Sequence, residues 1–108
     1  MKIIVVGCGK VGATLTEQLN REGHDLVVID LDENALRSLT ETIDVLGVAG
    51  NGATYNVQKE AGIETADLLI AVTSSDELNL LCCLIAKKAS GFHTIARVRT
   101  PEYLHEIN

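Results

Sequence analysis

The feature that most constrains the fold is a glycine-rich loop directly after a short β-branched run. The run KIIVV is followed at once by GCGKVG, which opens a segment with helical spacing of its apolar residues. In such a strand–loop–helix unit Gly7 permits a tight turn, Gly9 lets a pyrophosphate approach the backbone, and Gly12 lets the helix pack closely on the strand. Lys10, inside the loop, either reaches a phosphate or points into solvent. The context predicts a dinucleotide site at the helix N-terminus, with a plain glycine turn as the alternative.

Short apolar runs alternate with helical patterns along the rest of the chain, which is typical of repeated βαβ units. The predicted strands are residues 2–6, 26–30, 45–49, 68–72 and 93–98. The apolar stripes expected to face the sheet are Val11, Leu15 and Leu19; Leu36, Leu39 and Ile43; and Leu78, Leu81, Cys82, Ile85 and Ala89. Right-handed crossovers then predict an α/β fold of the Rossmann type, a doubly wound parallel sheet in the order 3-2-1-4-5.

The length of 108 residues suits one domain and not two. We therefore expect residues 1–108 to form a single Rossmann-type nucleotide-binding domain. The usual sheet of this type has a sixth strand, whereas this sequence stops at Asn108 in the middle of a helical pattern. The fold is expected to be truncated after the fifth strand, as in a fragment of a longer chain.

The composition argues against several classes of function. The net charge is −6, aromatic residues make up 3% and there is no Trp, whereas a nucleic-acid binder is expected to carry a basic face and stacking aromatics. No apolar run approaches the roughly 20 residues that span a bilayer, so no direct membrane insertion is expected. The three cysteines, Cys8, Cys82 and Cys83, lack metal-ligand spacing, which favours a reduced cytoplasmic setting and no metal site.

Asp30 is the candidate for the acid that binds a ribose. It ends the second predicted strand, 18 residues after Gly12, close to the roughly 20-residue spacing of this acid in dinucleotide-binding units. With Asp32 and Glu33 it would repel a 2′-phosphate, so NAD(H) or another unphosphorylated adenosine ligand is favoured over NADP. The alternative for Asp30 is a turn or cap residue, and capping of the next helix is the favoured role of Asp32.

Further candidates follow the later strands. Gly50-Asn51-Gly52 and Thr73-Ser74 are expected at the ligand-binding edge of the sheet, with turn and cap chemistry as the alternative. Arg97 and Arg99 alternate in the fifth predicted strand, so they are expected on one face. Two guanidiniums there suit a phosphate or a partner's carboxylates, and the alternative is a pair of solvated surface charges.

The sequence places no residue as a catalytic acid, base or nucleophile. Hydride transfer needs an acid or base beside a substrate pocket. His24 precedes the second strand, His93 begins the fifth strand at the opposite end, and His105 lies in the polar C-terminal stretch. Cys8 has no nearby His to activate it, so packing is its favoured role. We expect a binding module with no catalytic residues; the alternative is the cofactor-binding half of an NAD-dependent dehydrogenase.

Three long segments carry a family resemblance. The first is KIIVVGCGKVGATLTEQLNREGHDLVVIDLDENALRSL; the more specific ones are VLGVAGNGATYNVQKEAGIETADLLIAVTSSDELNLL and TIARVRTPEYL. The patterns GI-x-x-AD-x-x-IAVT-x-x-DE-x-N and ARVR-x-PEY within them are similar to TrkA-type potassium-uptake regulators. Over essentially its whole length the chain resembles the TrkA-N domain, also called the RCK or KTN domain. Glu77 and Asn79 match the motif of that family after the fourth strand, with no bond assigned to either.

The resemblance implies a cytoplasmic regulatory subunit that lies at the inner face of the membrane through a potassium transporter or channel partner. It implies homo-oligomers, as dimers or higher rings, and NAD(H) as ligand, with ATP or ADP possible in the same cleft. A further alternative is the nucleotide-binding tail of a glutathione-gated potassium efflux system.

By matching positions, the resemblance places Asn51, Gly52 and Ala53 at the adenosine portion of the ligand. It places Thr73 and Arg97 near the phosphates or the distal portion. The complete set of residues expected to bind the nucleotide is Gly7, Cys8, Gly9, Lys10, Val11, Gly12, Asp30, Leu31, Asn51, Gly52, Ala53, Thr73 and Arg97.

Overall fold

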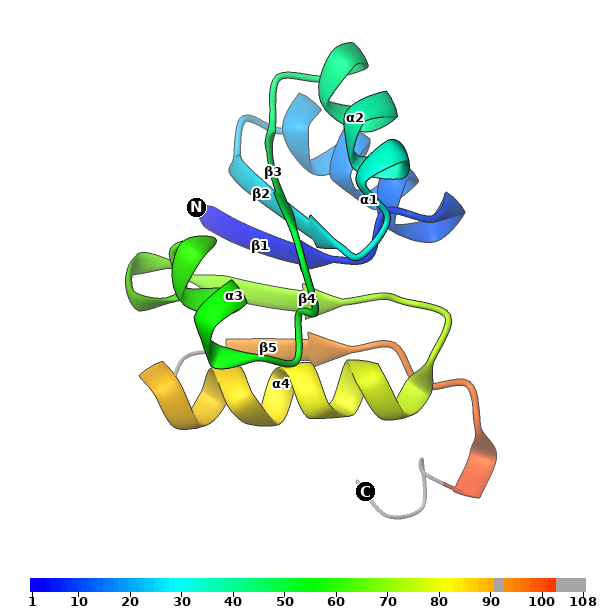
Figure 1. Ribbon diagram of the computed structural model, residues 1–108, viewed down its shortest axis with the longest axis vertical. Coiled ribbons are helices and arrows are strands. Elements are labelled where there is room, and N and C mark those ends of the chain that lie inside the picture. The colour runs from blue at the N-terminus through cyan, green and yellow to red at the C-terminus, as the bar shows by residue number, and fades with distance from the viewer. Residues whose placement is uncertain (91–92, 103–108) are drawn as a thin grey trace.

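The computed structural model describes residues 1–90 and 93–102, in which strands and helices alternate in the expected order (Figure 1). The strands are β1 (Lys2–Val6), β2 (Asp25–Asp30), β3 (Leu46–Ala49), β4 (Leu68–Ala71) and β5 (His93–Ala96). The helices are α1 (Lys10–Arg21), α2 (Glu33–Thr42), α3 (Tyr55–Glu60) and α4 (Asp76–Ser90), with a 3-10 turn at Ile63–Thr65. Only β5 departs from its predicted bounds by more than one residue, because it ends at Ala96.

The five strands are all parallel and lie in the order β3-β2-β1-β4-β5, which confirms the predicted fold class. The central strand is β1, whose Val5 is paired with Val28 of β2 on one side and Ile70 of β4 on the other. The chain leaves β1 toward β2 and returns to β4 on the other side of β1. The connections after β1 and β4 therefore diverge to opposite faces and leave a crevice at the carboxyl ends of these strands.

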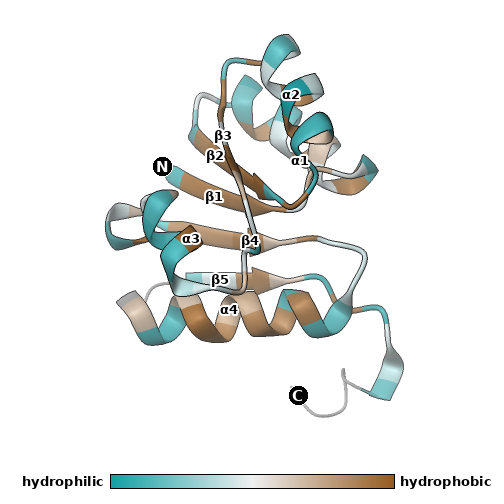
Figure 2. Cartoon of the chain, viewed as in Figure 1, coloured by the Kyte–Doolittle hydropathy of each residue, from teal (hydrophilic) through white to brown (hydrophobic). Residues whose placement is uncertain are grey.

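The central strands β1, β2 and β4 are hydrophobic on both faces because helices cover both faces (Figure 2). Ile3 and Val5 of β1 belong to the core under α1 and α2, whereas Ile4 and Val6 belong to the core under α3 and α4. All four side chains are at most 2% exposed. Burial on both sides explains why the parallel strands read as continuous apolar runs instead of alternating ones.

The inner surface of α1 differs from the predicted stripe. Its buried residues are Gly12 and Thr16, whereas Val11 is 42% exposed and the side chains of Leu15 and Leu19 are half-buried. The helix packs so closely on the loop before it that only a glycine, Gly12, fits against the Gly7 carbonyl. Val11, which continues the helical spacing of Leu15 and Leu19, is thus not part of the core.

The inner surface of α4 is more polar than its apolar pattern predicted. Residues Asp76, Asn79, Cys82 and Ala86 are its buried positions. Burial of Cys82 was predicted correctly, but Leu81 is 46% exposed. The helix is rotated because Asp76 and Asn79 make hydrogen bonds to the loops after β4 and β5, which are described below.

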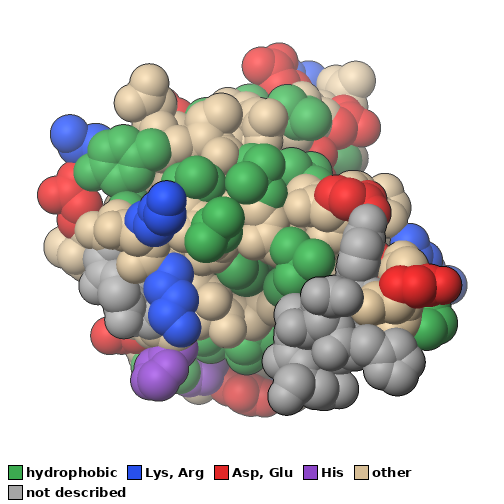
Figure 3. All heavy atoms as spheres, turned by 90° about the horizontal axis from the view of Figure 1, so that it is seen from below, with side chains coloured by type: hydrophobic (Ala, Val, Ile, Leu, Met, Phe, Trp, Pro, Cys, Tyr) green, Lys and Arg blue, Asp and Glu red, His purple; other side chains and the backbone are tan. Residues whose placement is uncertain are grey.

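The rotation of α4 leaves large apolar side chains on the surface. Leu84 of α4 and Ile95 of β5 are each 53% exposed, and Leu81 lies one helical turn before Leu84. Figure 3 looks onto this face and shows hydrophobic side chains gathered across it, with basic and acidic groups toward its borders. We call Leu81, Leu84 and Ile95 the α4–β5 apolar surface.

Candidate functional site

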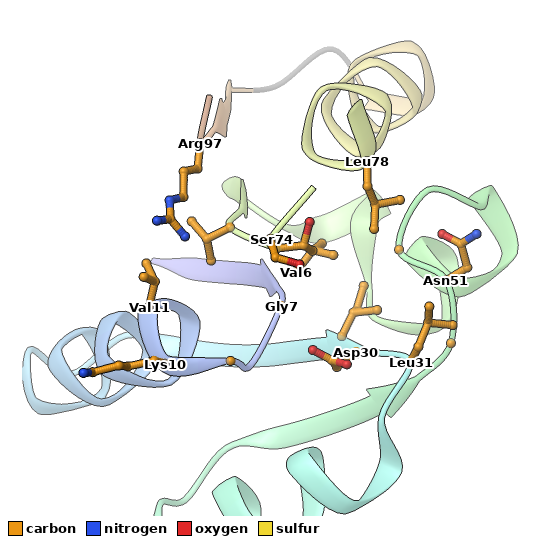
Figure 4. Close-up of a pocket in the computed structure, with 16 residues that line it drawn as sticks. Val6, Gly7, Lys10, Val11, Asp30, Leu31, Asn51, Ser74, Leu78 and Arg97 are labelled. Atoms are coloured by element: carbon orange, nitrogen blue, oxygen red, sulfur yellow. The ribbon is translucent and has the colours of Figure 1, made fainter. Parts of the chain in front are cut away.

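A cleft of about 400 Å³ opens at the carboxyl ends of β1, β2 and β4, where the strand order reverses (Figure 4). Its volume lies in the range of small-molecule sites. The lining residues come from five separate segments and are Val6, Gly7, Gly9, Lys10, Val11, Ile29, Asp30, Leu31, Gly50, Asn51, Gly52, Val72, Thr73, Ser74, Leu78 and Arg97. The apolar floor consists of the last strand residues, and the polar groups stand around it.

The N-terminus of α1 faces this cleft without a cap. Gly9 is the N-cap residue, no side chain caps the helix, and its first turn contains no acidic residue. By contrast, the Asp32 carboxylate caps α2 by accepting from the N–H groups of Asn34 and Ala35 at 3.0 and 3.2 Å. A helix end with free N–H groups and an uncompensated positive dipole is suited to hold an anion.

The glycines of the loop differ in what their missing side chains allow. A Cβ on Gly9 would meet no protein atom within 4 Å, so packing does not require glycine there, and the open space belongs to the cleft. A Cβ on Gly12 would lie 1.8 Å from the carbonyl oxygen of Gly7. Gly7 itself has a φ of 108°, a conformation that favours glycine. The assigned roles of Gly7 and Gly12, turn and close packing, are confirmed.

Asp30 ends β2 at the rim of the cleft and holds the loop before α1. Its Oδ2 accepts from the Cys8 N–H at 2.8 Å, and its Oδ1 accepts from the Asp32 N–H at 2.8 Å. Each carboxylate oxygen can accept a further hydrogen bond. The turn role that the sequence left as an alternative is therefore present together with a position suited to bind ribose hydroxyls.

The loop after β3 forms the wall beside Asp30. The Oδ1 of Asn51 accepts from the Ala53 N–H at 2.8 Å, which closes the turn. A Cβ on Gly52 would lie 2.5 Å from a methyl of Val6, so this loop is packed against the end of β1. The carbonyl of Gly52 accepts from the buried Nε2 of Gln58 at 2.8 Å. Turn chemistry thus fixes the loop and leaves Asn51 and Gly52 at the cleft.

The opposite wall is formed by Thr73 after β4 and Arg97 after β5. The Arg97 side chain extends toward the side of the cleft on which Val11 lies in the first turn of α1 (Figure 4). Its backbone N–H donates to the Ala71 carbonyl at 2.9 Å, which continues the β4–β5 pairing by one residue. A guanidinium here faces the same space as the N-terminus of α1, so this wall carries a positive charge opposite Asp30.

Ten of the thirteen predicted residues line the cleft, and Cys8, Gly12 and Ala53 do not. The Cys8 side chain is 6% exposed and packs in the core under α1 and α2, in agreement with its favoured packing role. Gly12 is buried against Gly7, and Ala53 packs against the core under α3 and α4. The Lys10 side chain is exposed and runs along α1 away from Asp30 and Asn51 (Figure 4).

Arg97 and Arg99 do not share the cleft, which corrects the expectation that they face one ligand. β5 ends at Ala96, so the two residues no longer alternate in a strand. The Nη2 of Arg99 donates to the Ser74 carbonyl at 2.8 Å. The backbone N–H of Arg99 donates to Asp76 Oδ2 at 3.0 Å. Arg99 therefore joins the segment after β5 to the start of α4.

Asp76 is the residue in this region whose role the sequence missed. Its Oδ2 accepts from the N–H and the hydroxyl of Thr100 as well as from the Arg99 N–H. The Thr100 hydroxyl is the main cause that holds the pKa of Asp76 below its ordinary value, against the opposing effect of burial. The sequence predicted only that an acid suits the first turn of α4, because the partners lie more than 20 residues away.

Burial keeps the cysteine thiols of the core protonated. Burial, and then the Asp30 carboxylate, raises the pKa of Cys8 from 9.0 to about 12. Burial raises the pKa of Cys82 to about 12 as well, and it also raises the pKa of Cys83. None of these thiols is poised as a nucleophile at neutral pH.

The raised thiol pKa values predict a loss of stability in alkali. Between pH 9 and 12 the thiols of the unfolded chain ionise while those of Cys8 and Cys82 in the fold do not, so the free energy of unfolding should fall as the pH rises. Urea unfolding from pH 8 to 10.5 measures this slope. The double variant C8A/C82A should have a flatter slope, and an equal slope in the two proteins would contradict the assignment.

The histidines that the structure describes lie away from the cleft. His24 lies at the opposite edge of the sheet, where its Nδ1 is 3.2 Å from the N-terminal amine. His93 begins β5 away from the cleft, and His105 lies outside the described residues. Within residues 1–90 and 93–102 no cluster of three metal-ligating side chains occurs, and no helix is long and apolar enough to span a membrane.

The sheet order and the cleft at its reversal define a Rossmann-type domain with a nucleotide-sized crevice. The family model of the TrkA-N domain matches residues 3–108. The chain therefore belongs to the TrkA-N domain family.

Several curated relatives are named Trk system potassium uptake protein TrkA or a homolog of it. The protein from Halomonas elongata is 48% identical over 105 residues, which are 96% of this chain and 23% of the relative. The homolog from Archaeoglobus fulgidus is 40% identical over 104 residues, again 96% of this chain and 23% of the relative. The chain thus spans about a quarter of the length of these relatives.

Solved structures share the fold. The TrkA-N domain of the inner membrane protein ybaL from Escherichia coli has a TM-score of 0.89 and 27% identity, covering 98% of this chain and 78% of that one. The GsuK channel bound to NAD has a TM-score of 0.84 and 23% identity, covering 98% of this chain and 19% of that one. The match to GsuK concerns the fold alone.

Proposed function

We propose that this domain binds NAD(H) in the cleft and that the bound nucleotide is a signal that regulates a potassium transporter or channel. The observation that carries the proposal is the uncapped N-terminus of α1, which faces a cleft with Asp30 on one wall and Arg97 on the other. The curated relatives are named as potassium uptake proteins, and the GsuK channel has been solved with NAD. These names support the assignment of ligand and role.

The walls of the cleft suit the two ends of a dinucleotide. Asp30 would accept hydrogen bonds from the adenosine ribose, with Asn51 on the same wall. The pyrophosphate would lie over Gly9 and the first turn of α1, where a Cβ would otherwise project. The distal half would extend toward Thr73 and Arg97. ATP or ADP would occupy the same adenosine wall and direct its phosphates to the cationic wall.

A regulatory role fits this cleft better than hydride transfer does. No histidine of the described residues lines the cleft, whose charged lining residues are Lys10, Asp30 and Arg97, with Asp30 and Arg97 on opposite walls. We therefore propose that the domain is not an enzyme. A nucleotide regulates an assembly only by binding two of its states with different affinity, and moving a population from 1:99 to 99:1 needs about 5.5 kcal/mol.

Nucleotide affinities test the proposed function directly. NADH and NAD⁺ differ by the positive charge of the nicotinamide ring, which would meet Arg97. We expect NADH to bind more tightly than NAD⁺, and both more tightly than NADP(H), whose 2′-phosphate would approach Asp30. Isothermal titration calorimetry at constant salt measures all four. Absence of binding by adenine nucleotides would overturn the proposal. Equal affinity for NADH and NAD⁺ would show that the domain does not distinguish them by the charge of the nicotinamide ring.

We also propose that the domain self-associates and works at the cytoplasmic face of the membrane beside a potassium-transporter subunit. The α4–β5 apolar surface supports the first part, because contiguous exposed apolar side chains mark association sites.

On this basis Leu84→Glu should convert an associated species to monomer at equal concentration, since a charge would be buried in the contact. Light scattering coupled to size exclusion measures the mass. Arg37→Glu on exposed α2 is the control, and an unchanged mass in L84E would rule out this surface.

A further inference from the structure

Asn79 is a buried amide that uses both ends of its side chain on the wall of the cleft. It lies in the second turn of α4 and is 0% exposed. Its Oδ1 accepts from the N–H of Thr73 at 2.8 Å and from the Thr73 hydroxyl at 2.7 Å. Its Nδ2 donates to the carbonyls of Thr73 at 3.1 Å and of Arg97 at 3.0 Å. Asn79 thus fills its four hydrogen-bonding positions without lining the cleft itself.

These bonds fix the backbone from which the cationic wall is built. Arg97 is held at its N–H by the Ala71 carbonyl and at its own carbonyl by Asn79. Thr73 is held at its N–H, its carbonyl and its hydroxyl, and the hydroxyl also accepts from the Ser75 N–H at 3.2 Å. Without Asn79, Thr73 and Arg97 would lose the side chain that both of them bind.

Gln58 makes an equivalent connection on the opposite wall. It is also 0% exposed, and its Nε2 donates to the Gly52 carbonyl at 2.8 Å and to the Cys82 carbonyl at 3.0 Å. The loop beside Asp30 is therefore anchored to α4 by one buried amide, and the wall with Thr73 and Arg97 by another. The two amides act on different halves of the cleft.

We infer that Asn79 is a positioning residue that sets the preference of the cleft for a dinucleotide over a mononucleotide. It acts by holding Thr73 and Arg97 where the distal half of the ligand lies, and it has no role at the adenosine wall. This inference rests on the proposed function, because it assumes that an adenine nucleotide binds with its ribose at Asp30.

The test compares two matched changes of a buried amide to a carboxylate. In Asn79→Asp one oxygen still accepts from Thr73, but the other faces the carbonyls of Thr73 and Arg97 and repels them. In Gln58→Glu a carboxylate oxygen faces the carbonyls of Gly52 and Cys82 in the same way. Calorimetry measures the affinity of each variant for NADH and for AMP, which lacks the distal half. Comparing the two affinities separates an effect on the distal wall from an effect on the adenosine wall. Thermal unfolding of each variant reports the structural cost.

We expect N79D to weaken NADH binding about tenfold and AMP binding less than about twofold, as for loss of one well-placed polar contact. Q58E should weaken both ligands by similar factors. A purely structural role for Asn79 would lower the unfolding temperature and weaken both ligands in proportion, and that result would overturn the inference. If the unaltered chain binds neither ligand, the proposed function itself fails.

Two further measurements keep the test decisive if the carboxylate variants do not fold. Asn79→Ser adds no charge, and its short hydroxyl cannot reach Thr73 and Arg97 together, so the same selective loss of NADH is expected. In the unaltered chain, saturating NADH should slow amide hydrogen exchange at Thr73 more than saturating AMP does. Equal protection by the two ligands would overturn the inference.

Discussion

Replacement of Gly12 by alanine is expected to destabilise the domain strongly. The added Cβ would lie 1.8 Å from the Gly7 carbonyl oxygen and 2.7 Å from its carbon, so the backbone of the loop or of α1 must move. Overpacking of this kind costs about 3 kcal/mol or more when backbone has to shift, which corresponds to a fall of roughly 10–20 °C in Tm for a domain of this size. Differential scanning calorimetry of the free domain measures the fall.

Gly9→Ala is the matched control in the same loop. Its Cβ meets no protein atom within 4 Å, and its φ of −69° suits any residue. The unfolding temperature should therefore change little, while NADH affinity should drop because the methyl occupies the space proposed for the pyrophosphate. Equal destabilisation by G9A and G12A would contradict the packing of α1 against the loop. Retained affinity in G9A would contradict the placement of the phosphates.

Asp30→Ala is expected to give the largest loss of ligand affinity. The change removes a charged acceptor from the adenosine wall, and hydrogen bonds to charged groups contribute about 1.5–3 kcal/mol, equivalent to roughly 10- to 150-fold in Kd. Because the carboxylate also accepts from the N–H groups of Cys8 and Asp32, the fold should lose stability as well. Calorimetry with NADH and thermal unfolding measure the two effects separately.

Asp32→Ala distinguishes the roles of these neighbouring acids. Asp32 caps α2 and does not line the cleft. Its loss should cost about 1 kcal/mol of stability, as for other N-cap residues, and leave NADH affinity within about twofold, a minor change on the free-energy scale. If D32A weakens NADH binding as much as D30A does, the ribose does not bind specifically at Asp30.

The fold could be predicted because its determinants are local. Apolar runs of strand length, helical spacing between them and the glycines at 7, 9 and 12 are each read within a few residues. Most of the cleft followed from the same information, because residues after the strands of a parallel sheet meet at one edge. That rule correctly brought Asp30, Asn51 and Thr73 together from three distant segments.

What could not be predicted depends on contacts between distant residues. Asn79 and Asp76 are polar residues on the buried side of α4, and only the loops after β4 and β5 explain why they face inward. Because β5 ends at Ala96, Arg99 binds Ser74 and Asp76 at the start of α4, and of the two arginines Arg97 lines the cleft. Nothing in the local sequence distinguishes these two arginines.

The uncapped start of α1 has a consequence for the domain without its ligand. The other long helices carry their own N-terminal acceptors, Asp32 for α2 and Ser75 for α4, whereas α1 begins at Gly9 with none. A bound phosphate would complete this helix as a capping side chain would. The ligand would then act as the N-cap of α1, and the first turn of α1 would lose this stabilisation when the ligand dissociates.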